Sequence, residues 1–496
     1  MTEERGYELL KENAELKSEL LMIKQEMTQL RRMIFGSKSE RFVPAQNPDQ
    51  LSLDITPEEP SEVTAIPQKK KIEAYDRKVP SDQKIHPVRQ GFPEHLPREI
   101  TIIKPEGDLS GCKKMGEEIT EVLDLIEPKF FVKRFVREKY VHEQTGKISI
   151  GELPSRAIDK SLFGENLIAQ IITNKYVDHL PLYRQIERFK RDGMTLSAST
   201  LNDTVKNSCG LLKPLYQHLR EQVLSDDYLQ VDETPIKVLD PSTKGKTHRG
   251  YHWVYHAVNK QLILFDYRQG RGREGPEELL KNFSGYLQTD GYQVYDAFTK
   301  RKDIILVGCM AHVRRKFDEA RQNDQNLAEN ALLLIQRLYI IEKAIREHSG
   351  ISDAEIMRLR QEMSLPTLQD FENWLKLHLT DTLPKSAIGQ AIQYALPRME
   401  KLRRYTEQSY LQIDNNLVEN AIRPVAVGRK NYLFAGSHEG AERAAMIYSF
   451  FGTCKLNNIN PQHWLADILT KINNTKTSQL ENLLPANWKV ANTKNY

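Results

Sequence analysis

The sequence has few cysteines and no long apolar run. Four cysteines, at positions 112, 209, 309 and 454 of 496 residues, are too few and too scattered for a disulfide framework, so we expect a reducing compartment. The longest apolar stretch, residues 304–311, is far shorter than the ~18 to 20 residues that cross a bilayer. The first residues alternate charges where a secretory signal would be apolar. We therefore expect a soluble, cytoplasmic protein.

The sequence also has almost no excess of one charge. Its 71 Lys and Arg against 67 Asp and Glu leave a net charge of +4, which neither demands nor excludes a polyanionic partner. Any nucleic-acid surface must therefore come from local clusters of basic residues. The 39% of hydrophobic residues are enough for a sizeable core, which excludes a wholly disordered chain, and the length suggests about three domains.

Apolar side chains recur in a seven-residue register within residues 1–35, which predicts a coiled coil. One seam position holds Asn13, whose buried amide pairs best with its own copy in a parallel two-stranded coil. We therefore expect dimerisation through this helix, and the alternative is a single amphipathic helix that lies on its own protein. The seam residues are Leu9, Asn13, Leu16, Leu20, Ile23, Met27 and Leu30.

Residues 36–98 are rich in proline and lack hydrophobic periodicity, so they are interpreted as a linker. Residues 99–155 predict a small module with short strands at 118–126 and 129–143. The second strand alternates aromatic and basic side chains, such as Phe131, Arg134 and Phe135. These residues either face a nucleic-acid backbone or form the solvated basic side of a half-buried strand.

Residues 156–225 follow a helical pattern. Two of the helices meet at a short turn, with Gly193 as the stop of one and Ser197 or Ser199 as the cap of the next, and the pair resembles a helix-turn-helix. We expect this region to bind DNA through basic side chains. Those residues are Arg184, Arg188, Lys190, Arg191 and Lys206.

Residues 226–317 alternate between strand and helix patterns. Strands are expected at 228–239, 250–258, 261–267, 285–290 and 303–309, and helices at 275–283, at 291–298 and from 311 onward. This order, βββαβαβα, is that of the ribonuclease H type of fold, a mixed five-stranded sheet flanked by helices. In that fold the first and fourth strands are neighbours.

Two aspartates fall on those neighbouring strands. Asp232 lies inside the first strand, and Asp290 ends the fourth. A carboxylate within an apolar strand is costly to bury unless something pairs with it. Two carboxylates at one point of the sheet repel each other, and a bound divalent cation removes the conflict. The alternative, a turn or hydrogen-bonding residue, is reasonable for Asp290 before Gly291 and poor for Asp232.

The expected third acidic residue is Glu419, one turn into a helix that Asp414 or Asn415 can cap, with Asp414 as the alternative ligand. Two Mg²⁺ (or Mn²⁺) ions held by Asp232, Asp290 and Glu419 would activate a water or a DNA 3′ hydroxyl for in-line attack on phosphate. Basic residues near these acids are expected to contact DNA phosphates. They are Arg314, Arg315, Arg423, Arg429 and Lys430.

The interval from Asp290 to Glu419 is more than twice that from Asp232 to Asp290, which implies an inserted domain. Residues 318–408 are helical in pattern, and we expect their basic residues at 398, 401, 403 and 404 to form another DNA-facing patch. Residues 409–455 then complete the core begun at 226–317, and residues 456–496 are a C-terminal extension. The predicted fold class is a multidomain α+β protein with a coiled coil, a β-rich module, a helical DNA-binding region and a ribonuclease H-like catalytic core.

Seven segments together carry a family resemblance. They are FGSKSER (35–41), KYVDHLPLYRQIERF (175–189), VDETPIKVLD (231–240), SGYLQTDGYQVYDA (284–297), GCMAHVRRKF (308–317), DNNLVENAIRPVAVGRKNYLFAGS (414–437) and SFFGTCKLNNINPQHWLADIL (449–469). Over nearly its whole length the chain resembles the insertion-sequence sixty-six family of bacterial DDE transposases. The resemblance implies that Asp232, Asp290 and Glu419 are the catalytic triad and that residues 318–408 are the family's helical insertion.

The resemblance also implies a function. It is the binding of an element's terminal inverted repeats in double-stranded DNA, cleavage of the 3′ ends and their transfer to target DNA. Self-association as a dimer or higher assembly and small accessory proteins are expected with it. The alternatives are an inactive or domesticated copy that binds DNA without cutting, which the presence of all three acids disfavours, and a ribonuclease H-like nuclease without strand transfer.

Zinc is the remaining question about cofactors. The family usually has a four-cysteine zinc module, whereas residues 99–155 retain only Cys112, with His142 near another ligand position, so this degenerate zinc-finger-like module is predicted to fold without zinc. Cys309 and His312 have a spacing that suits zinc but no second pair nearby. We favour a structural role in which they tie the strand end to the insertion.

Overall fold

The structure is a computed structural model that describes residues 130–141, 148–150, 154–159, 161–239, 246–348 and 350–488. The expected coiled coil and linker lie outside the described residues, as do Cys112 and His142, and the predictions about them stay predictions. Within the described ranges, no helix is long and apolar enough to span a membrane.

Seven strands and a larger set of helices make up the described chain. The strands are β1 (Lys139–Val141), β2 (Ile148–Ile150), β3 (Tyr228–Leu239), β4 (Thr247–Ala257), β5 (Leu262–Arg268), β6 (Gly285–Gln288) and β7 (Ile304–Val307). The α-helices are α2 (Glu165–Tyr176), α3 (Leu182–Arg191), α4 (Ala198–Leu224), α5 (Glu274–Leu279), α6 (Met310–Glu319), α7 (Gln325–Glu347), α8 (Asp353–Leu359), α9 (Leu365–Leu379), α10 (Ala387–Ala395), α11 (Met399–Arg403), α12 (Asn416–Tyr432), α13 (His438–Leu456) and α14 (Pro461–Lys471). Short 3₁₀ segments are η1 (Gln293–Lys300), η2 (Ala320–Gln322), η4 (Leu396–Arg398), η5 (Arg404–Thr406), η6 (Ile472–Asn474) and η7 (Thr477–Leu483), and η3 (Arg360–Ser364) is a π-helical turn.

A mixed five-stranded sheet has the order β5-β4-β3-β6-β7. The first three strands pair antiparallel, whereas β3 pairs parallel with β6 and β6 parallel with β7. The expected adjacency of the first and fourth strands is therefore confirmed, and Gln230 stands opposite Gln288 in the register. Two details differ from the prediction. Strand β6 ends at Gln288, two residues before Asp290, and the segment expected as an α-helix at 291–298 is the 3₁₀ helix η1.

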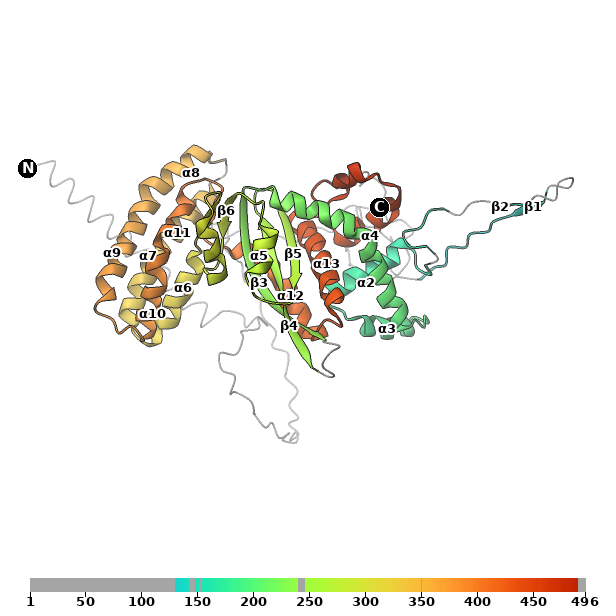
Figure 1. Cartoon of the computed structure of the whole chain (residues 1–496), viewed down its shortest axis with the longest axis horizontal. Helices are drawn as coiled ribbons and strands as arrows, with labels where there is room; N and C mark the ends of the chain where they lie inside the picture. The colour runs from blue at the N-terminus through green and yellow to red at the C-terminus, as the bar shows by residue number, and fades with distance from the viewer. Residues whose placement is uncertain are drawn as a thin grey trace, which may run out of the picture. The chain divides into compact units, whose positions relative to one another are not determined.

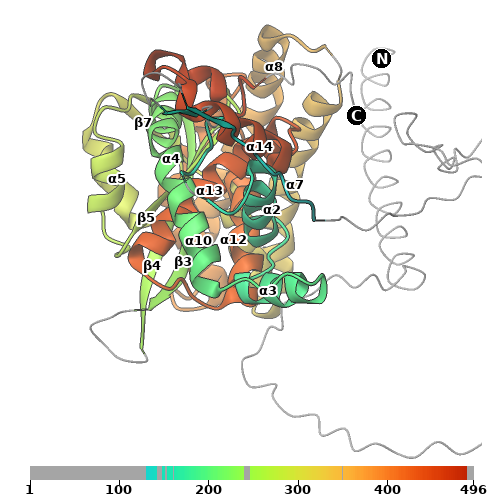
Figure 2. The same ribbon diagram turned by 90° about the vertical axis from the view of Figure 1, so that its right-hand side faces the viewer.

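Helix α13 protects the open edge of the sheet. An edge strand leaves every second backbone N–H unpaired. Along β5 these groups are satisfied by hydroxyls of α13, because Ile263 N donates to Thr453 Oγ1 (3.1 Å) and Phe265 N donates to Ser449 Oγ (2.7 Å). Both hydroxyls are buried. Helix α14 packs against α2, and both contact α13 (Figure 2). One hydrophobic core thus joins the sheet to the helices on its β5 side.

The helices of residues 161–224 follow the sequence prediction. Gly193, at φ +81°, ends α3 in a conformation that favours glycine, and the Ser197 hydroxyl caps α4 by accepting from Thr200 N (3.1 Å). The strand predicted at 129–143 is mostly wrong, since residues 130–138 have no regular structure and are exposed. Its alternating aromatic side chains face no second apolar layer among the described residues, and only β1 pairs, with β2.

The expected insertion at 318–408 is helical, and its core is a second hydrophobic cluster that also includes Tyr228 of β3 and Val307 of β7. Figure 1 draws its helices (yellow to orange) on the β6 side of the sheet, and α11 contacts β7. Its basic residues, predicted to face DNA, bind protein groups instead. Lys401 pairs with Asp296 (2.9 Å), Arg403 pairs with Glu372, and Arg404 donates to the carbonyl of Leu306 (2.9 Å). That prediction is wrong because long-range partners of this kind cannot be seen in the local pattern.

A buried ion pair holds the end of the insertion. The Arg360 guanidinium donates to both carboxylate oxygens of Glu342, at 2.9 and 2.8 Å. It also donates to four backbone carbonyls in the connection back to the sheet, those of Tyr405, Gln408, Ser409 and Leu411. A buried arginine is tolerated only with partners of this kind. The connection is therefore shaped around one side chain.

Replacing Arg360 is expected to destabilise the insertion strongly. Arg360→Met leaves the Glu342 carboxylate and four carbonyls buried without a donor, so we expect a loss of about 3–5 kcal/mol in the free energy of unfolding. Urea denaturation followed by circular dichroism measures it. Arg358→Met, which removes an exposed arginine paired with Glu355, should leave the stability close to that of the wild type. Equal losses in the two variants would contradict this account.

Candidate active site

Two buried glutamines join the strands that lead to the acidic residues. Gln230 on β3 and Gln288 on β6 are both fully buried. The Gln230 amide donates to Gln288 Oε1 (2.9 Å) and to the carbonyl of Asp414 (2.9 Å). Gln230 precedes Asp232 by two residues, so both side chains project from the same face of β3.

The network continues to two further elements. The Gln288 amide donates to the carbonyl of Gly308, after β7, and to that of Gln412, at 2.9 and 2.8 Å. In the first turn of α12, Val418 N donates to Gln230 Oε1 (3.3 Å). The elements that carry Asp232, Asp290 and Glu419 are thus bonded to one pair of side chains. Sequence reasoning missed both glutamines, although a glutamine two residues before each aspartate was a visible signal.

Asp232 lies among other carboxylates. Its Oδ1 accepts a hydrogen bond from Glu233 N (2.7 Å). Burial, above all, raises the pKa of Asp232 to about 8. The nearby charges of Glu233, Asp290 and Glu419 contribute to the same rise. The residues predicted as a catalytic triad therefore lie close enough to repel one another.

Asp290 occupies a tight turn after β6. Its Oδ1 accepts from Tyr292 N (2.8 Å), and Gly291 has φ +87°. A helical residue of the insertion holds its backbone, because the Tyr394 hydroxyl donates to the Asp290 carbonyl (2.7 Å). The sequence offered two alternatives for Asp290, a turn residue or a neighbour of Asp232. In the structure Asp290 is a turn residue, and its charge also acts on Asp232.

Glu419 lies in the first turn of α12, as predicted. Helix α12 is fixed along β3, because Arg429 donates to Thr234 Oγ1 (3.0 Å) and to the Pro235 carbonyl (2.8 Å). His312 Nε2 and Arg315 Nη2 lie 3.7 and 3.8 Å from the Glu419 carboxylate. Its Oε1 is buried without a hydrogen bond.

A fourth carboxylate, Glu233, was not predicted. Its side chain is 2% exposed and accepts from Arg271 Nε (2.8 Å). The Arg271 guanidinium lies over the Tyr292 ring, 4.1 Å from its centre. Burial raises the pKa of Glu233, and the hydrogen bond from Arg271 opposes this rise. Two consecutive acids in an apolar strand were the available signal, since one of them had to face each side of the sheet.

The carboxylates fit a divalent cation by their chemistry. Carboxylate oxygens suit Mg²⁺, which commonly takes one or two carboxylates and completes its shell with water and substrate phosphate. Glu419 Oε1 is buried without a hydrogen bond, and burial together with the neighbouring carboxylates raises the pKa of Asp232, so a cation would lower the cost of ionising these groups. In the described part of the chain, no three His, Cys, Asp or Glu side chains are grouped as a protein-only metal site requires. A cation here would therefore rely on water or phosphate oxygens as well.

The alternative ligand Asp414 is committed elsewhere. Its Oδ2 accepts from the Tyr339 hydroxyl (2.9 Å) of the insertion, and its Oδ1 accepts from Asn416 N (3.1 Å). The latter bond caps the start of α12, whereas the Asn415 side chain makes no cap. These bonds turn the Asp414 carboxylate toward α12 and the insertion.

Cys309 and His312 join β7 to the start of α12. The Cys309 thiol donates to Asn415 Oδ1 (2.9 Å), and His312 Nδ1 lies 3.2 Å from the same sulfur. Burial raises the pKa of Cys309 to about 12, so the thiol stays protonated and can donate its hydrogen bond to Asn415. The thiol's bond reaches the segment after the insertion, and the expected tie to residues 318–408 is corrected accordingly.

The predicted DNA-contacting residues divide into two groups. Exposed side chains project from α3 and α4 and, near the carboxylates, from α6 and α12. They are Arg184, Arg188, Lys190, Arg191, Lys206, Arg314, Arg315, Arg423 and Lys430. Arg429 differs, because it is half-buried and directs its guanidinium to β3. Its structural contacts were not visible in the sequence.

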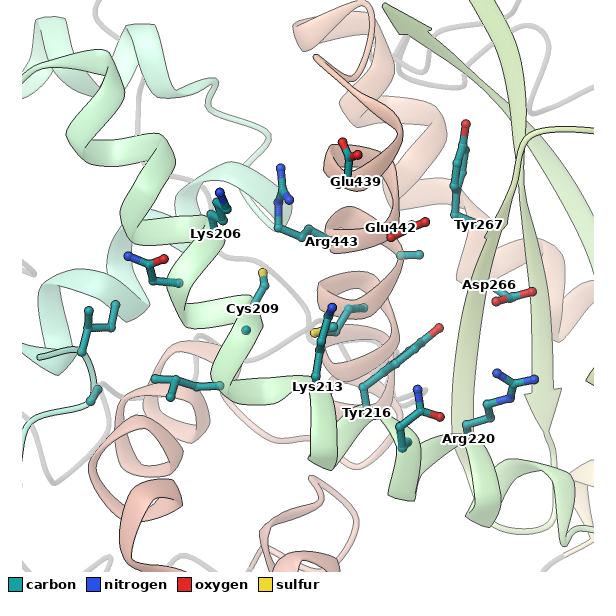
Figure 3. Close-up of a pocket in the computed structure, with 18 of the residues that line it drawn as sticks. Lys206, Cys209, Lys213, Tyr216, Arg220, Asp266, Tyr267, Glu439, Glu442 and Arg443 are labelled. Atoms are coloured by element: carbon teal, nitrogen blue, oxygen red, sulfur yellow. The ribbon is translucent and has the colours of Figure 1, made fainter. Parts of the chain in front are cut away.

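A cavity of about 1130 Å³ lies apart from the carboxylates, among α4, β5 and α13. Figure 3 shows Lys206 and Arg443 near one another on facing helices, with Cys209 below them. Acidic residues of α13 and β5, such as Glu439, Glu442 and Asp266, line it as well. Because the lining mixes both charges, this cavity is not a continuous track for a polyanion.

The family is shown by profile matches along the chain. A profile described as Transposase IS66 family matches residues 160–443, the IS66 C-terminal element matches 449–486, and a profile described as Transposase C of IS166 homeodomain matches 23–101. The chain is thus a transposase of an insertion sequence. It belongs to the Transposase IS66 family, as the sequence motifs predicted.

Three relatives match the chain over most of its length. The uncharacterized protein y4hP of Sinorhizobium fredii is 31% identical over 507 residues, which cover 95% of this chain and 89% of that protein. The uncharacterized proteins y4qI and y4jD of the same organism are 33% and 30% identical, over 93% and 97% of this chain and 87% and 98% of their own lengths. No solved structure matches the chain.

The glutamine network should be essential for stability. Gln288→Leu leaves the Gly308 and Gln412 carbonyls and the Gln230 amide buried with fewer partners, so we expect a loss of about 2–4 kcal/mol in the free energy of unfolding. Thermal and urea unfolding measure this loss. The matched control, Gln217→Leu on the exposed face of α4, should change stability by less than about 0.5 kcal/mol. A Gln288→Leu variant as stable as this control would refute the role of the network.

Proposed function

We propose that this transposase cuts and joins DNA at Asp232, Asp290 and Glu419 in a ribonuclease H-like core. The observation that carries the proposal is the gathering of these carboxylates from β3, the β6 turn and α12 around one buried amide network. The mixed sheet with its parallel β3–β6 pair supports such a core. Divalent cations, when bound, would supply the activation of the attacking hydroxyl and the stabilisation of the leaving oxygen.

The chain's own residues bind and orient the DNA phosphate. Burial and the charges of neighbouring carboxylates raise the pKa of the half-buried Asp232, and the half-buried Glu419 is one of those carboxylates. Arg315, 3.8 Å from Glu419, and the exposed Arg423 one turn further along α12 place positive charge beside them. This charge offsets the repulsion between the carboxylates and an approaching phosphate.

We further propose that α3 and α4 bind the terminal inverted repeats. The basic residues of α3 are exposed, and the turn at Gly193 joins α3 to α4 as in a helix-turn-helix. Target DNA would lie at the carboxylates. Dimerisation through residues 1–35 and the need for small accessory proteins remain part of the proposal, as does a paired-end assembly.

The acidic residues are expected to be indispensable for chemistry. Asp232→Asn, Asp290→Asn and Glu419→Gln should each lower DNA cleavage and strand transfer with Mg²⁺ by at least about a hundredfold, because each removes a charge that the reaction uses. Gel assays on duplexes with the element's ends measure both steps. Asp318→Asn, an exposed control paired with Arg321, and Asp414→Asn should retain activity. Wild-type activity in Asp232→Asn would dispose of the proposal.

The basic residues of α3 are expected to set the salt dependence of DNA binding. Replacing Arg184, Arg188 and Arg191 by Ala should lower the slope of log affinity against log salt by up to about three, since each phosphate contact contributes about 0.9. Titrations of labelled end DNA between low and moderate salt measure the slope. The matched triple variant on α7, at the exposed Arg337, Lys343 and Arg346, should leave it unchanged. If the α3 and α7 triple variants have identical slopes, the end DNA does not bind to α3.

A further inference from the structure

The helical insertion grips the turn that carries Asp290. Two side chains more than a hundred residues later in the chain bond consecutive backbone carbonyls of this turn. The Tyr394 hydroxyl donates to the carbonyl of Asp290 (2.7 Å), and Arg398 Nη2 donates to the carbonyl of Gly291 (3.2 Å). Tyr394 belongs to α10 and Arg398 to η4, so both lie on helices of the insertion.

The two gripping side chains support each other. The Arg398 guanidinium lies over the Tyr394 ring, 4.0 Å from its centre, and its Nη1 donates to the Tyr394 carbonyl (2.8 Å). Neither side chain therefore needs another group to hold its orientation. We name this pair and its two bonds the Asp290 clamp.

Gly291 is the residue that lets the clamp close. A Cβ at this position would lie 2.8 Å from Arg398 Nε and 3.2 Å from the Tyr394 hydroxyl, and the φ of +87° favours glycine. The turn and the insertion can therefore pack this closely only because residue 291 has no side chain.

The base of the clamp is itself anchored to the sheet. Gly308 N, after β7, donates to the carbonyl of Lys401 (2.9 Å), and Arg404 donates to the Leu306 carbonyl (2.9 Å). These contacts lie within one turn or two of Arg398. The insertion is therefore hydrogen-bonded both to β7 and to the neighbouring Asp290 turn.

We propose that Tyr394 and Arg398 are positioning residues, and that the insertion fixes the Asp290 turn so that its carboxylate faces Asp232 and Glu419. This inference rests on the proposed function. The turn's own bonds are few: the Asp290 side chain accepts from Tyr292 N, the Thr289 hydroxyl accepts from Gly291 N (3.4 Å), and Thr289 N donates to the Val307 carbonyl (3.2 Å). Without the clamp, the peptide between Asp290 and Gly291 can rotate, and the carboxylate moves with it.

Two readouts on the metal-free and the Mn²⁺-titrated full chain test the clamp without relying on catalysis. Tyr394→Phe keeps the ring under Arg398 and removes only the hydroxyl, and Arg398→Met removes the second bond. Each variant should speed amide hydrogen exchange at Gly291 and Tyr292 by about tenfold and weaken Mn²⁺ binding, measured by calorimetry, several-fold. DNA cleavage should fall with the Mn²⁺ affinity and recover in part at high Mn²⁺.

The matched control is Tyr216→Phe, which removes a tyrosine hydroxyl bonded to the Phe265 carbonyl on the opposite edge of the sheet. It should change neither readout. If Tyr394→Phe and Arg398→Met behave like this control while Asp232→Asn is inactive, the clamp is wrong and the proposed function stands. If Asp232→Asn and Asp290→Asn keep full cleavage, the proposed function fails, and with it any positioning for catalysis.

Discussion

The hydrogen bonds between Gln230 and Gln288 are the contact on which the site depends. A buried amide that lacks partners costs about 1–3 kcal/mol, so each of these side chains is acceptable only when its partners are in place. Those partners come from β3, β6, the end of β7 and the segment that leads into α12. The hydrogen bonds that satisfy the two buried glutamines are therefore the same bonds that bring the three acid-bearing elements together.

The same hydrogen bonds explain why the fold can keep mutually repelling carboxylates close together. Asp232 is half-buried beside other acids, and burial together with their charges raises its pKa, so its ionisation is costly there. The elements cannot move apart to relieve the repulsion, because the amide network and the contacts of Arg429 hold α12 on β3. The remaining means of relief are protonation or a cation. The proposed cations would relieve the repulsion without protonation.

Local patterns were sufficient to predict the strands of the five-stranded sheet and the helical insertion. They also singled out the three acids, because an acid in an apolar strand or in a helix's first turn is a local anomaly. Failures occurred where the deciding contact is distant. Arg429 looks like an exposed arginine in the sequence, yet it bonds Thr234 nearly two hundred residues away. Phe131 and Phe135 alternate as in a strand, but no described layer covers them. Glu233 was missed because its partner, Arg271, lies in a loop beyond β5.

The insertion illustrates why such distant contacts matter for function. It enters the chain between α6 and α12, and so between the elements that carry Asp290 and Glu419. Its core is continuous with Tyr228 and Val307 of the sheet, and the buried Arg360–Glu342 pair fixes the connection back to the sheet. Its basic residues act on the protein: Lys401 and Arg404 bond η1 and β7, while Tyr394 and Arg398 reach the Asp290 turn. The insertion thereby forms one wall of the proposed site, at the turn that carries Asp290.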